Sequence, residues 1–461
     1  MSEEITKDLK RIVPKRWKRY PRCKDSGVEW IGEIPEGWET VRLKHLTKKI
    51  GSGITPRGGA ENYLVWGIPL IRSQNVQFEG LSLEGLAHIS DEQNKKMINS
   101  KALPNDVLLN ITGASIGRTC MVPQNMEQSN VNQHVCIIRP RRSSLSQFMW
   151  RFLSSEAGQI QVFEGEDGIS REGLNFERIK NFVITLPPDD DRKRITAYLD
   201  SNLTAIVSLI SKKQRLIELL KEKRAAIITR AVTKGLDPNA PMKDSGVEWI
   251  GEIPTNWRIF RLKDLARINP SKTEINHLAD DLEVSFVPMG SIGEYGGISG
   301  AEVKRLLDVK QGYTYFAEGD LIVAKITPCF ENYKGAIASN LVNGIGFGTT
   351  ELFVLRPNER VDLRYLFYVS ISKAFRQTGS NMMQGAAGQK RITADFVNNY
   401  PVALPRPEEQ RSIASSLEKA TEKMDSFISK IEKSIELLKE YRSALITAAV
   451  TGKIDVREEV P

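Results

Sequence analysis

The 461-residue sequence has few of the residues that bind metals or form disulfides. It contains four cysteines and four histidines, with no CxxC pair and no HxxxH or HExxH motif. The four cysteines stand far apart, at Cys23, Cys120, Cys136 and Cys329. This spacing argues against a zinc ribbon and against a dense disulfide scaffold. We therefore expect no metal centre and a reducing compartment.

Long apolar runs are also missing. No uninterrupted apolar stretch approaches the roughly 18 residues that a membrane span needs. The first residues, MSEEITKDLKRIVPKRWKRYPR, lack the apolar core of a secretory signal. We expect a cytoplasmic protein that does not associate with membranes.

Motifs for nucleotide chemistry are absent as well. No GxxxxGK[ST] string is present, so a phosphate-binding P-loop is not expected. The amino-methyltransferase tetrad of Asn or Asp, two prolines and an aromatic residue is missing, because LPPD at 186–189 lacks the aromatic. These absences argue against a methyltransferase or nuclease that acts alone, and we expect a chain with no catalytic residues and no cofactor of its own.

What the sequence does contain is enough apolar material for sizeable cores and a moderate excess of positive charge. Hydrophobic residues make up 40%, and 65 Lys and Arg against 57 Asp and Glu give a net charge of +8. The length suggests roughly three structural units. The charge favours a polyanionic partner.

The chain also contains an internal repeat. Residues 24–35 read KDSGVEWIGEIP, and residues 243–254 repeat this string without a mismatch. A second string, IELLKE, occurs at 217–222 and again at 435–440. The two strings recur after 219 and 218 residues, and two copies of a repeat of that length account for nearly the whole chain after a basic leader. A repeat of this length is far too long for a solenoid.

Each copy ends in a segment with the apolar spacing of a long amphipathic helix. The expected seam positions are Leu203, Ile206, Ile210, Ile217, Leu220, Ile227 and Ala231 in the first copy, and Thr421, Met424, Ile428, Ile435, Leu438, Leu445 and Ala449 in the second. A helix over 191–232 would be roughly 63 Å long at 1.5 Å per residue. Because a lone helix of that length needs a partner for its apolar stripe, we expect the two to pair antiparallel.

The middles of the two copies, 45–180 and 264–398, share little sequence. Short β-branched runs alternate there with Gly, Asn, Ser and Pro, which is typical of strand-rich α/β lobes with long loops. One shorter helix is expected at about 145–164 and another at about 362–379. The two copies are similar at their ends and different in their middles. This pattern predicts that both copies share one scaffold but present two different surfaces.

The expected fold is α+β: two strand-rich α/β lobes separated by two long antiparallel coiled-coil-like helices, in a tandem repeat with pseudo-twofold symmetry. The expected divisions are a basic arm at 1–22, a lobe at 23–187, a long helix at 188–237, a second lobe at 238–405 and a long helix at 406–461.

The repeated string KDSGVEWIGEIPxxW, the divergent lobes, the proline-rich junctions and the string ITxAVT near each helix end resemble the specificity subunit of type I restriction–modification systems. The resemblance covers essentially residues 18–456. It implies that each lobe is a target recognition domain that reads one half of a bipartite, asymmetric DNA sequence. It also implies that the helices set the spacing of the half-sites.

The resemblance implies partners too: double-stranded DNA, two methyltransferase subunits that modify adenine, and restriction subunits. S-adenosylmethionine, ATP and Mg²⁺ would then be bound by those partners, and this chain would be non-catalytic. Two alternatives within binding proteins stay open: an orphan subunit that binds DNA without directing modification, and a protein scaffold.

Base edges are read by Arg, Lys, Asn and Gln, and phosphates are bound by cations, hydroxyls and backbone amides. In the first lobe such residues occur in loop-like stretches, and the amide-rich run at 129–134 is the best candidate for adenine recognition. The candidates are Ser52, Thr55, Arg57, Thr112, Ser115, Arg118, Asn130, Asn132, Gln133, His134 and Arg171. A solvated turn is the alternative for each.

The second lobe offers different residue types at corresponding places, as an asymmetric target would require. The candidates are Lys325, Thr327, Asn332, Lys334, Thr349, Thr350, Gln389, Lys390 and Arg391. A solvated charge cluster is the alternative for the last three.

Arg224 and Arg442 interrupt the two apolar seams. A cation at such a position is costly unless it is paired, so each is a candidate for setting the helix register. The alternative is that each side chain extends to the surface. The leader, with Trp17 and Tyr20 among cations, could contact DNA or tether the arm to the repeat.

Overall fold

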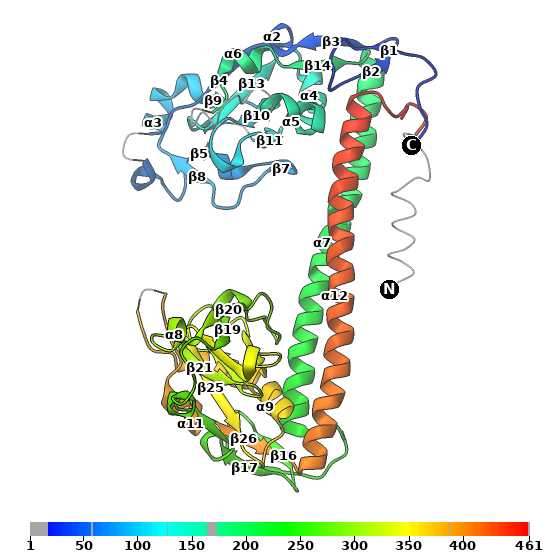
Figure 1. Cartoon of the computed structure of the whole chain (residues 1–461). Coiled ribbons are helices and arrows are strands. Elements are labelled where there is room, and N and C mark those ends of the chain that lie inside the picture. The colour runs from blue at the N-terminus through cyan, green and yellow to red at the C-terminus, as the bar shows by residue number, and fades with distance from the viewer. Residues whose placement is uncertain (1–16, 57–58, 127, 164–172, 387, 460–461) are drawn as a thin grey trace. The chain divides into compact units, whose positions relative to one another are not determined.

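The structure is a computed structural model, described here over residues 17–56, 59–126, 128–163, 173–386 and 388–459. Contacts divide the chain into two units, one of residues 1–213 with 433–461 and one of residues 214–432. Each unit contains one strand-rich lobe and a part of each of two long helices (Figure 1). The expected α+β fold with a tandem repeat is confirmed.

The two long helices are α7 (Asp189–Lys234) and α12 (Pro407–Val450). Both have acidic residues in the first turn, where carboxylates favour the positive end of the helix dipole. Gly235 and Gly452 follow the helices with φ of +75° and +71°, which a residue without a Cβ adopts at little cost. Both predicted helices are therefore present.

Within each unit the two helices pack along the expected seam. In the first unit, Leu203 and Ile206 of α7 share a hydrophobic core with Leu438 and Leu445 of α12. In the second unit, the expected Ala231 of α7 shares another core with Leu417 of α12. Ile228 is fully buried in this core, whereas the expected Ile227 is only partly buried against it. The ends that meet come from opposite directions along the two helices, so the pairing within each unit is antiparallel, as expected.

The lobe of the first unit contains two four-stranded sheets. One has the order β11-β10-β13-β4, and the other has the order β8-β5-β12-β9. All neighbours are antiparallel except β12 and β5. Their bounds are β4 (Thr47–Ser52), β5 (Ile68–Ile71), β8 (Ala87–Ile89), β9 (Lys101–Ala102), β10 (Val107–Asn110), β11 (Thr119–Met121), β12 (Ser129–Val131) and β13 (Val135–Pro140).

Three two-stranded pairings complete this unit: β1 (Cys23–Asp25) with β2 (Glu33–Pro35), β3 (Glu39–Arg42) with β14 (Val183–Leu186), and β6 (Val76–Gln77) with β7 (Gly80–Leu81). The helices of the lobe are α2 (Leu43–Leu46), α3 (Asp91–Lys96), α4 (Ser146–Ser154), α5 (Glu156–Phe163) and α6 (Phe176–Lys180).

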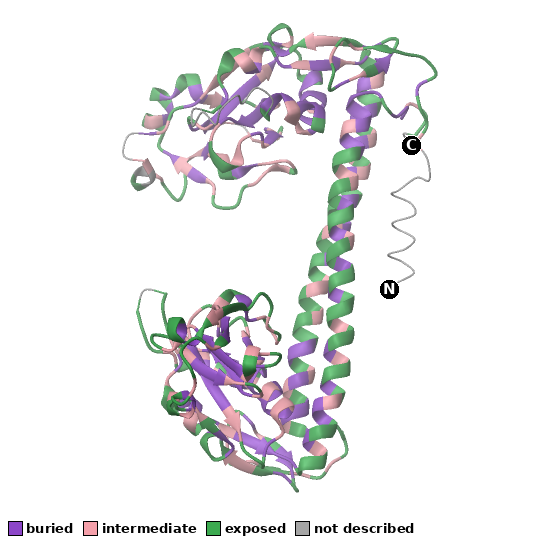
Figure 2. Cartoon of the chain, in the orientation of Figure 1, coloured by how far each residue is buried: buried purple, intermediate pink, exposed green. Residues whose placement is uncertain are grey.

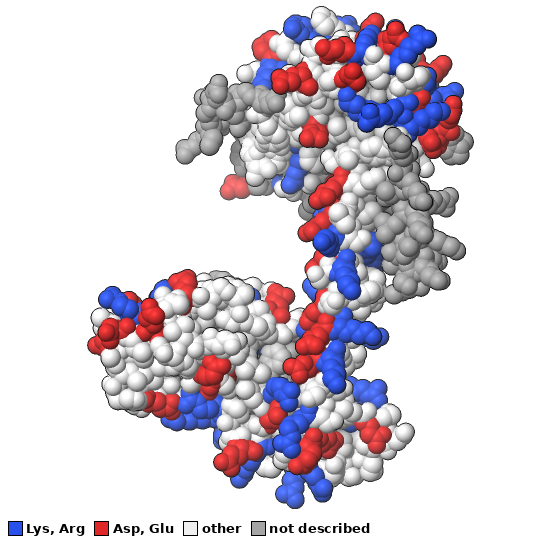
Figure 3. All heavy atoms as spheres, turned by 45° about the vertical axis from the view of Figure 1, so that its right-hand side comes forward, with Lys and Arg blue, Asp and Glu red and all other residues white. Residues whose placement is uncertain are grey.

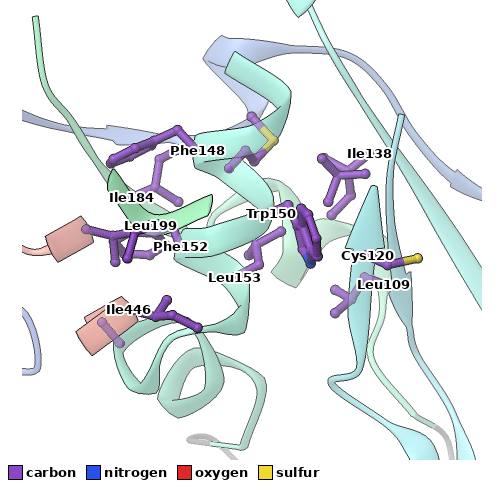
Figure 4. Close-up of a cluster of buried hydrophobic side chains, with 14 of the residues drawn as sticks. Leu109, Cys120, Ile138, Phe148, Trp150, Phe152, Leu153, Ile184, Leu199 and Ile446 are labelled. Carbon is purple, nitrogen blue, oxygen red and sulfur yellow. The ribbon is translucent and has the colours of Figure 1, made fainter. Parts of the chain in front are cut away.

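Helix α4 joins the sheet to the long helices. On one face Phe148 and Phe152 lie beside Leu199 of α7, and on the other Trp150 faces Leu109 and the sheet (Figure 4). The Trp150 indole N–H donates to the carbonyl of Thr119 at 3.0 Å, which satisfies its only polar atom. Burial of each large side chain contributes about 1.5–3 kcal/mol, so this helix fastens the lobe to α7 and α12.

The lobe of the second unit has the same two sheet orders, β23-β22-β25-β18 and β20-β19-β24-β21, with β19 and β24 again parallel. The bounds are β18 (Ala266–Ile268), β19 (Glu283–Val287), β20 (Glu302–Arg305), β21 (Thr314–Ala317), β22 (Leu321–Ala324), β23 (Gly335–Ile337), β24 (Ile345–Gly348) and β25 (Leu352–Pro357).

Two further pairings are β15 (Met242–Asp244) with β16 (Glu252–Pro254) and β17 (Arg258–Arg261) with β26 (Pro401–Leu404). The helices are α8 (Leu306–Val309), α9 (Leu363–Ser370), α10 (Lys373–Asn381) and α11 (Ala394–Asn399). In both lobes the purple core lies within the sheets and against the long helices, while the loops are mostly green (Figure 2).

The expected single short helix is two helices in each lobe, so that expectation is wrong. The chain breaks at Ser155, whose extended backbone ends α4 and whose hydroxyl accepts from the N–H of Gly158. In the second lobe Ser372 caps α10 by accepting from the N–H of Phe375. Serine side chains compete with the helix for backbone hydrogen bonds, so the apolar periodicity continues through a break that it does not reveal.

The described part of the leader packs against the end of the chain. Trp17 lies 6.1 Å from Tyr441 between ring centroids, and the Asp455 N–H donates to the carbonyl of Lys18 at 2.8 Å. The guanidinium of Arg457 lies 4.8 Å from the ring centroid of Tyr20. These contacts tie residues 17–20 to α12 and to the segment that follows it.

Candidate functional site

In the first lobe, three chain segments meet at one edge of the sheet that contains β10. Ser52, at the end of β4, is paired with Cys136 of β13, and Asn110, at the end of β10, is paired with Val135. The loops that follow β4 and β10 therefore lie beside the turn that precedes β13. This edge, which we call the first loop edge, is formed by residues 52–55, 111–118 and 132–134.

Direct contacts connect the candidate residues of the first loop edge. Thr112 Oγ1 lies 2.6 Å from Nδ1 of His134, and the N–H of Gly53 donates to the carbonyl of Asn132 at 3.2 Å. Ser115 Oγ accepts from the amide of Asn110 at 3.1 Å. Gly53 and Asn132, which are 79 positions apart in the sequence, are thus brought to one place.

Among the predicted candidates at this edge, Gln133 has an exposed side chain, and Ser52, Thr55, Thr112, Ser115, Arg118 and His134 are half-buried. The Arg118 guanidinium donates to Gln77 Oε1 at 3.2 Å, so it is held by β6. The sequence did not single out Gln77, since an isolated glutamine carries no motif. Arg57 and Arg171 lie outside the residues that the structure describes.

Two of the expected amide readers are buried. Residues 129–131 form β12, so the loop expected there is wrong, and Asn130 is 0% exposed. Its amide lies 2.6 Å from the side chain of Asn94 and within hydrogen-bonding distance of the carbonyls of Met97 and Ser100. Asn132 is buried as well and accepts from the N–H of His134. Both side chains are therefore used within the lobe: Asn130 through its whole amide and Asn132 through its amide oxygen.

The second lobe has an equivalent edge, the second loop edge, formed by residues 325–334, 349–351 and 388–391. Ala324, at the end of β22, is paired with Leu352, at the start of β25. Thr327 Oγ1 donates to the carbonyl of Gly388 at 2.7 Å and accepts from the N–H of Lys390 at 3.0 Å. The candidates of this lobe are therefore brought together too.

One cation of the second loop edge is already paired. Arg391 donates to both carboxylate oxygens of Glu351, each at 2.9 Å, and this hydrogen bonding lowers the pKa of Glu351. Lys334 donates to the carbonyl of Met289 at 3.0 Å. Among the predicted candidates at this edge, the exposed side chains are Asn332, Thr350, Gln389 and Lys390, and the neighbouring Glu331 is exposed too. The other candidates, Lys325, Thr327, Lys334, Thr349 and Arg391, are half-buried.

The two helix arginines have different partners. Arg224, with 7% exposure, donates to Asp425 of α12 at 2.5 and 3.1 Å and lies over the ring of Tyr295 at 4.3 Å. Arg442 instead forms an ion pair with Glu79 of the first lobe. Arg224 thus connects the two helices to each other and to a lobe, while Arg442 connects a helix to a lobe.

Sequence reasoning also overlooked an exposed apolar pair in the first lobe. Val65 and Trp66 are 93% and 81% exposed, between a β-bridge of Leu64 with His88 and the start of β5. Gly67 follows with φ of +137°, and an added Cβ would lie 2.6 Å from the carbonyl oxygen of Ile89. Adjacent large apolar residues usually indicate a core, so the sequence offered no signal that these two side chains extend into solvent.

Within the described ranges, no group of three or more His, Cys, Asp or Glu residues is arranged to hold a metal ion. None of the described helices is both long and apolar enough to cross a membrane. Lys and Arg alternate with Asp and Glu along the face of α7 and α12 seen in Figure 3, so this face of the helices carries no large patch of one sign.

Comparison with known proteins gives matches over most of the chain. The family model described as the type I restriction modification DNA specificity domain matches twice, at residues 35–219 and 254–437. The specificity subunit of the type I restriction enzyme EcoEI from Escherichia coli is 43% identical over 170 residues. That alignment covers 36% of this chain and 28% of the length of the relative.

Longer alignments are more distant. The MjaVIII specificity subunit from Methanocaldococcus jannaschii is 23% identical over 433 residues, which cover 92% of this chain and 94% of the relative. One solved chain, from a study of complex assembly and conformational transition in a type I restriction–modification system, has a TM-score of 0.65. It is 16% identical and covers 90% of this chain and 98% of its own length, so it supports the fold.

Proposed function

The chain belongs to the family of type I restriction–modification DNA specificity subunits, and from this premise we propose that each of its lobes reads one half of a bipartite, asymmetric DNA sequence. The subunit is the non-catalytic part of such a system. The observation that carries the proposal is the pair of loop edges. Equivalent edges of two equivalent sheets hold different side chains, and different side chains are what two different half-sites require.

At the first loop edge, Gln133 is the foremost candidate for base recognition. A glutamine amide pairs with N6 and N7 of adenine in the major groove, and this side chain is exposed beside Thr112 and His134. The half-buried hydroxyls of Ser52, Thr55 and Ser115 and the cation of Arg118 suit phosphates at the margin of that contact. Asn130 and Asn132 then support the edge from within the lobe.

At the second loop edge, Asn332 and Gln389 are the candidates for bases, and Lys390 is the candidate for a phosphate. Arg391 remains paired with Glu351 and orients the segment next to Thr327. Lys325, Lys334, Thr349 and Thr350 lie around these side chains and complete a polar surface. The same sheet edge thus presents a more cationic set of residues in the second lobe than in the first.

We further propose that α7 and α12 determine the separation of the half-sites and, with the frame around the repeated strings, bind two methyltransferase subunits and the restriction subunits. S-adenosylmethionine, ATP and Mg²⁺ would be bound by those partners in the cytoplasm. This part of the proposal rests on family membership and on two helices that run without a break through 46 and 44 residues.

The test is modification-sensitive sequencing of DNA from cells that express this chain with its methyltransferase subunit, with the methyltransferase alone as control. The expected result is a bipartite, asymmetric adenine-methylation motif that depends on this chain. Replacing residues 45–180 with the corresponding lobe of a relative should change one half of the motif only. A soluble complex that produces no motif would instead support an orphan or scaffold subunit.

A further inference from the structure

In both lobes, the same short helix is anchored to a long helix by the same kind of contact. Thr447 of α12 accepts a hydrogen bond at 3.0 Å from the N–H of Glu156, the first residue of α5. Thr229 of α7 accepts one at 3.0 Å from the N–H of Lys373, the first residue of α10. Both threonines belong to the repeated ITxAVT string. The repeated sequence therefore positions α5 and α10 in equivalent ways.

Three residues into each of these helices, a side chain extends to a loop of the proposed DNA-binding edge. The Gln159 amide donates to the carbonyls of Gly117 at 2.9 Å and Leu153 at 2.7 Å. The Arg376 guanidinium donates to the carbonyls of Lys334 at 3.3 Å and Ser370 at 2.7 Å. In each lobe one bond thus reaches the loop, and the other reaches the carbonyl three residues before the helix begins.

Gln159 and Arg376 are different residue types, and the two loops to which they donate hydrogen bonds differ in length. The loop between β10 and β11 covers residues 111–118, and the loop between β22 and β23 covers 325–334, which is two residues longer. Arg376 makes a third bond, from Nη1 to the carbonyl of Phe330 at 2.9 Å. A glutamine amide has two donors and could not serve three carbonyls.

Burying the Arg376 guanidinium to make these hydrogen bonds costs free energy. It is 2% exposed, and loss of solvent lowers its pKa to about 9. Within the described ranges no carboxylate is paired with it, and its guanidinium lies over the rings of Phe330 and Tyr333 at 4.6 and 5.8 Å. Burying an arginine without a carboxylate is unfavourable unless its donors are needed. All three of its nitrogens donate to carbonyls.

From these contacts we propose that Gln159 and Arg376 are equivalent positioning residues, which hold the loops 111–118 and 325–334 in the shape that reads DNA. This inference rests on the proposed function and deepens it. Neither residue touches DNA. Each transmits the position of a long helix, through Thr447 or Thr229 and a short helix, to residues such as Arg118 and Asn332 that face the half-site.

The experiment uses the full chain with its methyltransferase subunits and the variants Gln159→Met and Arg376→Lys. Gln159→Met keeps the length and packing of the side chain but removes both donors. Arg376→Lys keeps the cation but leaves one nitrogen in place of three. The two variants act on different lobes, so each lobe serves as the internal control for the other.

The first measurement is amide hydrogen exchange of the chain in the absence of DNA. Gln159→Met should speed exchange in residues 111–118 and leave 325–334 unchanged, and Arg376→Lys should do the reverse. The second measurement is the rate of methylation on targets that carry one base change in one half-site. Each variant should lose at least about tenfold of its discrimination in one half only, and the two variants should affect opposite halves.

Unchanged exchange in both loops would overturn the proposal, and so would an equal loss of discrimination in both halves. A purely structural role would lower the melting temperature and the overall rate but leave the ratio between correct and altered targets unchanged. If Gln159→Met fails to fold, Thr447→Val removes the anchor of α5 by another route and is expected to speed exchange in the same loop. If exchange changes as expected but the wild-type chain directs no methylation, the proposed function fails while the positioning role holds.

Discussion

The guanidinium of Arg224 on α7 donates to both carboxylate oxygens of Asp425 on α12, at 2.5 and 3.1 Å. The same guanidinium lies over the ring of Tyr295, which belongs to the second lobe. The Arg224 side chain therefore contacts α12 through an ion pair and the second lobe through a cation–π interaction. A shift of either helix by one residue would break the first contact.

The first prediction concerns this ion pair. Asp425→Asn should lower the free energy of unfolding by about 1–2 kcal/mol, because it leaves a largely buried guanidinium without its carboxylate while Asp425 itself is half exposed to water. Chemical denaturation of the full chain is the measurement. Arg215→Met on the exposed face of α7 is the matched control and should change stability by less than about 0.5 kcal/mol. A double-mutant cycle with Arg224→Met that gives no coupling would contradict the role of this pair.

The second prediction concerns the helix seam, where adjacent leucines provide a matched pair. Leu438 is 2% exposed and belongs to a hydrophobic core, whereas Leu437 is 55% exposed. Leu438→Ala should cost about 2–4 kcal/mol of unfolding free energy, since it removes buried methyl groups and leaves a cavity. Leu437→Ala should be close to neutral. Equal effects of the two substitutions would show that the seam is not where the structure places it.

The third prediction concerns base readout by Gln133. Gln133→Ala should change the base preference at one position of one half-site by about 1–3 kcal/mol, because it removes the paired donor and acceptor of the amide. Methylation of targets randomised at one position at a time measures this preference. Gln214→Ala, an exposed glutamine on α7, should leave every position unchanged.

The fourth prediction concerns the exposed cation at the second loop edge. Lys390→Ala should weaken binding to all DNA sequences alike and reduce the dependence of log affinity on log salt by about 0.9, the share of one phosphate. Titrations at several salt concentrations with specific and non-specific duplexes measure both quantities. Lys419→Ala on an exposed position of α12 is the control. A change in the methylation motif itself would contradict a phosphate contact and point to a base contact.

The fifth prediction concerns the buried thiols. Burial raises the pKa of Cys120 and of Cys136 to about 12 from an ordinary value of 9.0. Both thiols therefore stay protonated in the folded chain over a range in which the unfolded chain ionises. Their contribution to stability is complete below pH 9 and falls above it, by about 1.4 kcal/mol per pH unit for each thiol.

The measurement is the free energy of unfolding between pH 8 and 10, for the wild-type chain and for the Cys120→Ala, Cys136→Ala variant. The variant should lose stability less steeply as the pH rises. In the native chain, a thiol reagent should modify the exposed Cys23 and spare the two buried cysteines. Equal slopes for the two chains would contradict the burial of these thiols.

Patterns among neighbouring residues were enough to predict the tandem repeat and the two long helices. The exact repeat of KDSGVEWIGEIP located the two copies, and the spacing of residues such as Leu203, Ile206 and Leu438 located the seam. Acidic residues stand in the first turn of each helix, and a glycine follows its last turn. These signals are local, because helix periodicity and capping depend on neighbours within a few positions.

The loop edges were predicted less well, since polar runs have more than one use in a fold. Asn130 looked like part of a reading loop but is a buried residue of β12, because Asn94 and two carbonyls of the lobe satisfy its amide. Arg391 was predicted as a DNA-binding candidate, with a solvated charge cluster as the alternative, but it is paired with Glu351. The residues that neighbour Asn130 and Arg391 in the sequence do not indicate these partners.

The sequence by itself determined that the chain is a tandem repeat of an α+β unit with one long helix per copy and a family resemblance to DNA specificity subunits. Only the tertiary structure decided which polar side chains are free at the loop edges and which are used within the lobes. The physical reason is that amphipathic periodicity is written in consecutive residues. Whether a polar group meets solvent or a partner depends on residues that are distant in the chain, as Gln159 and Gly117 are.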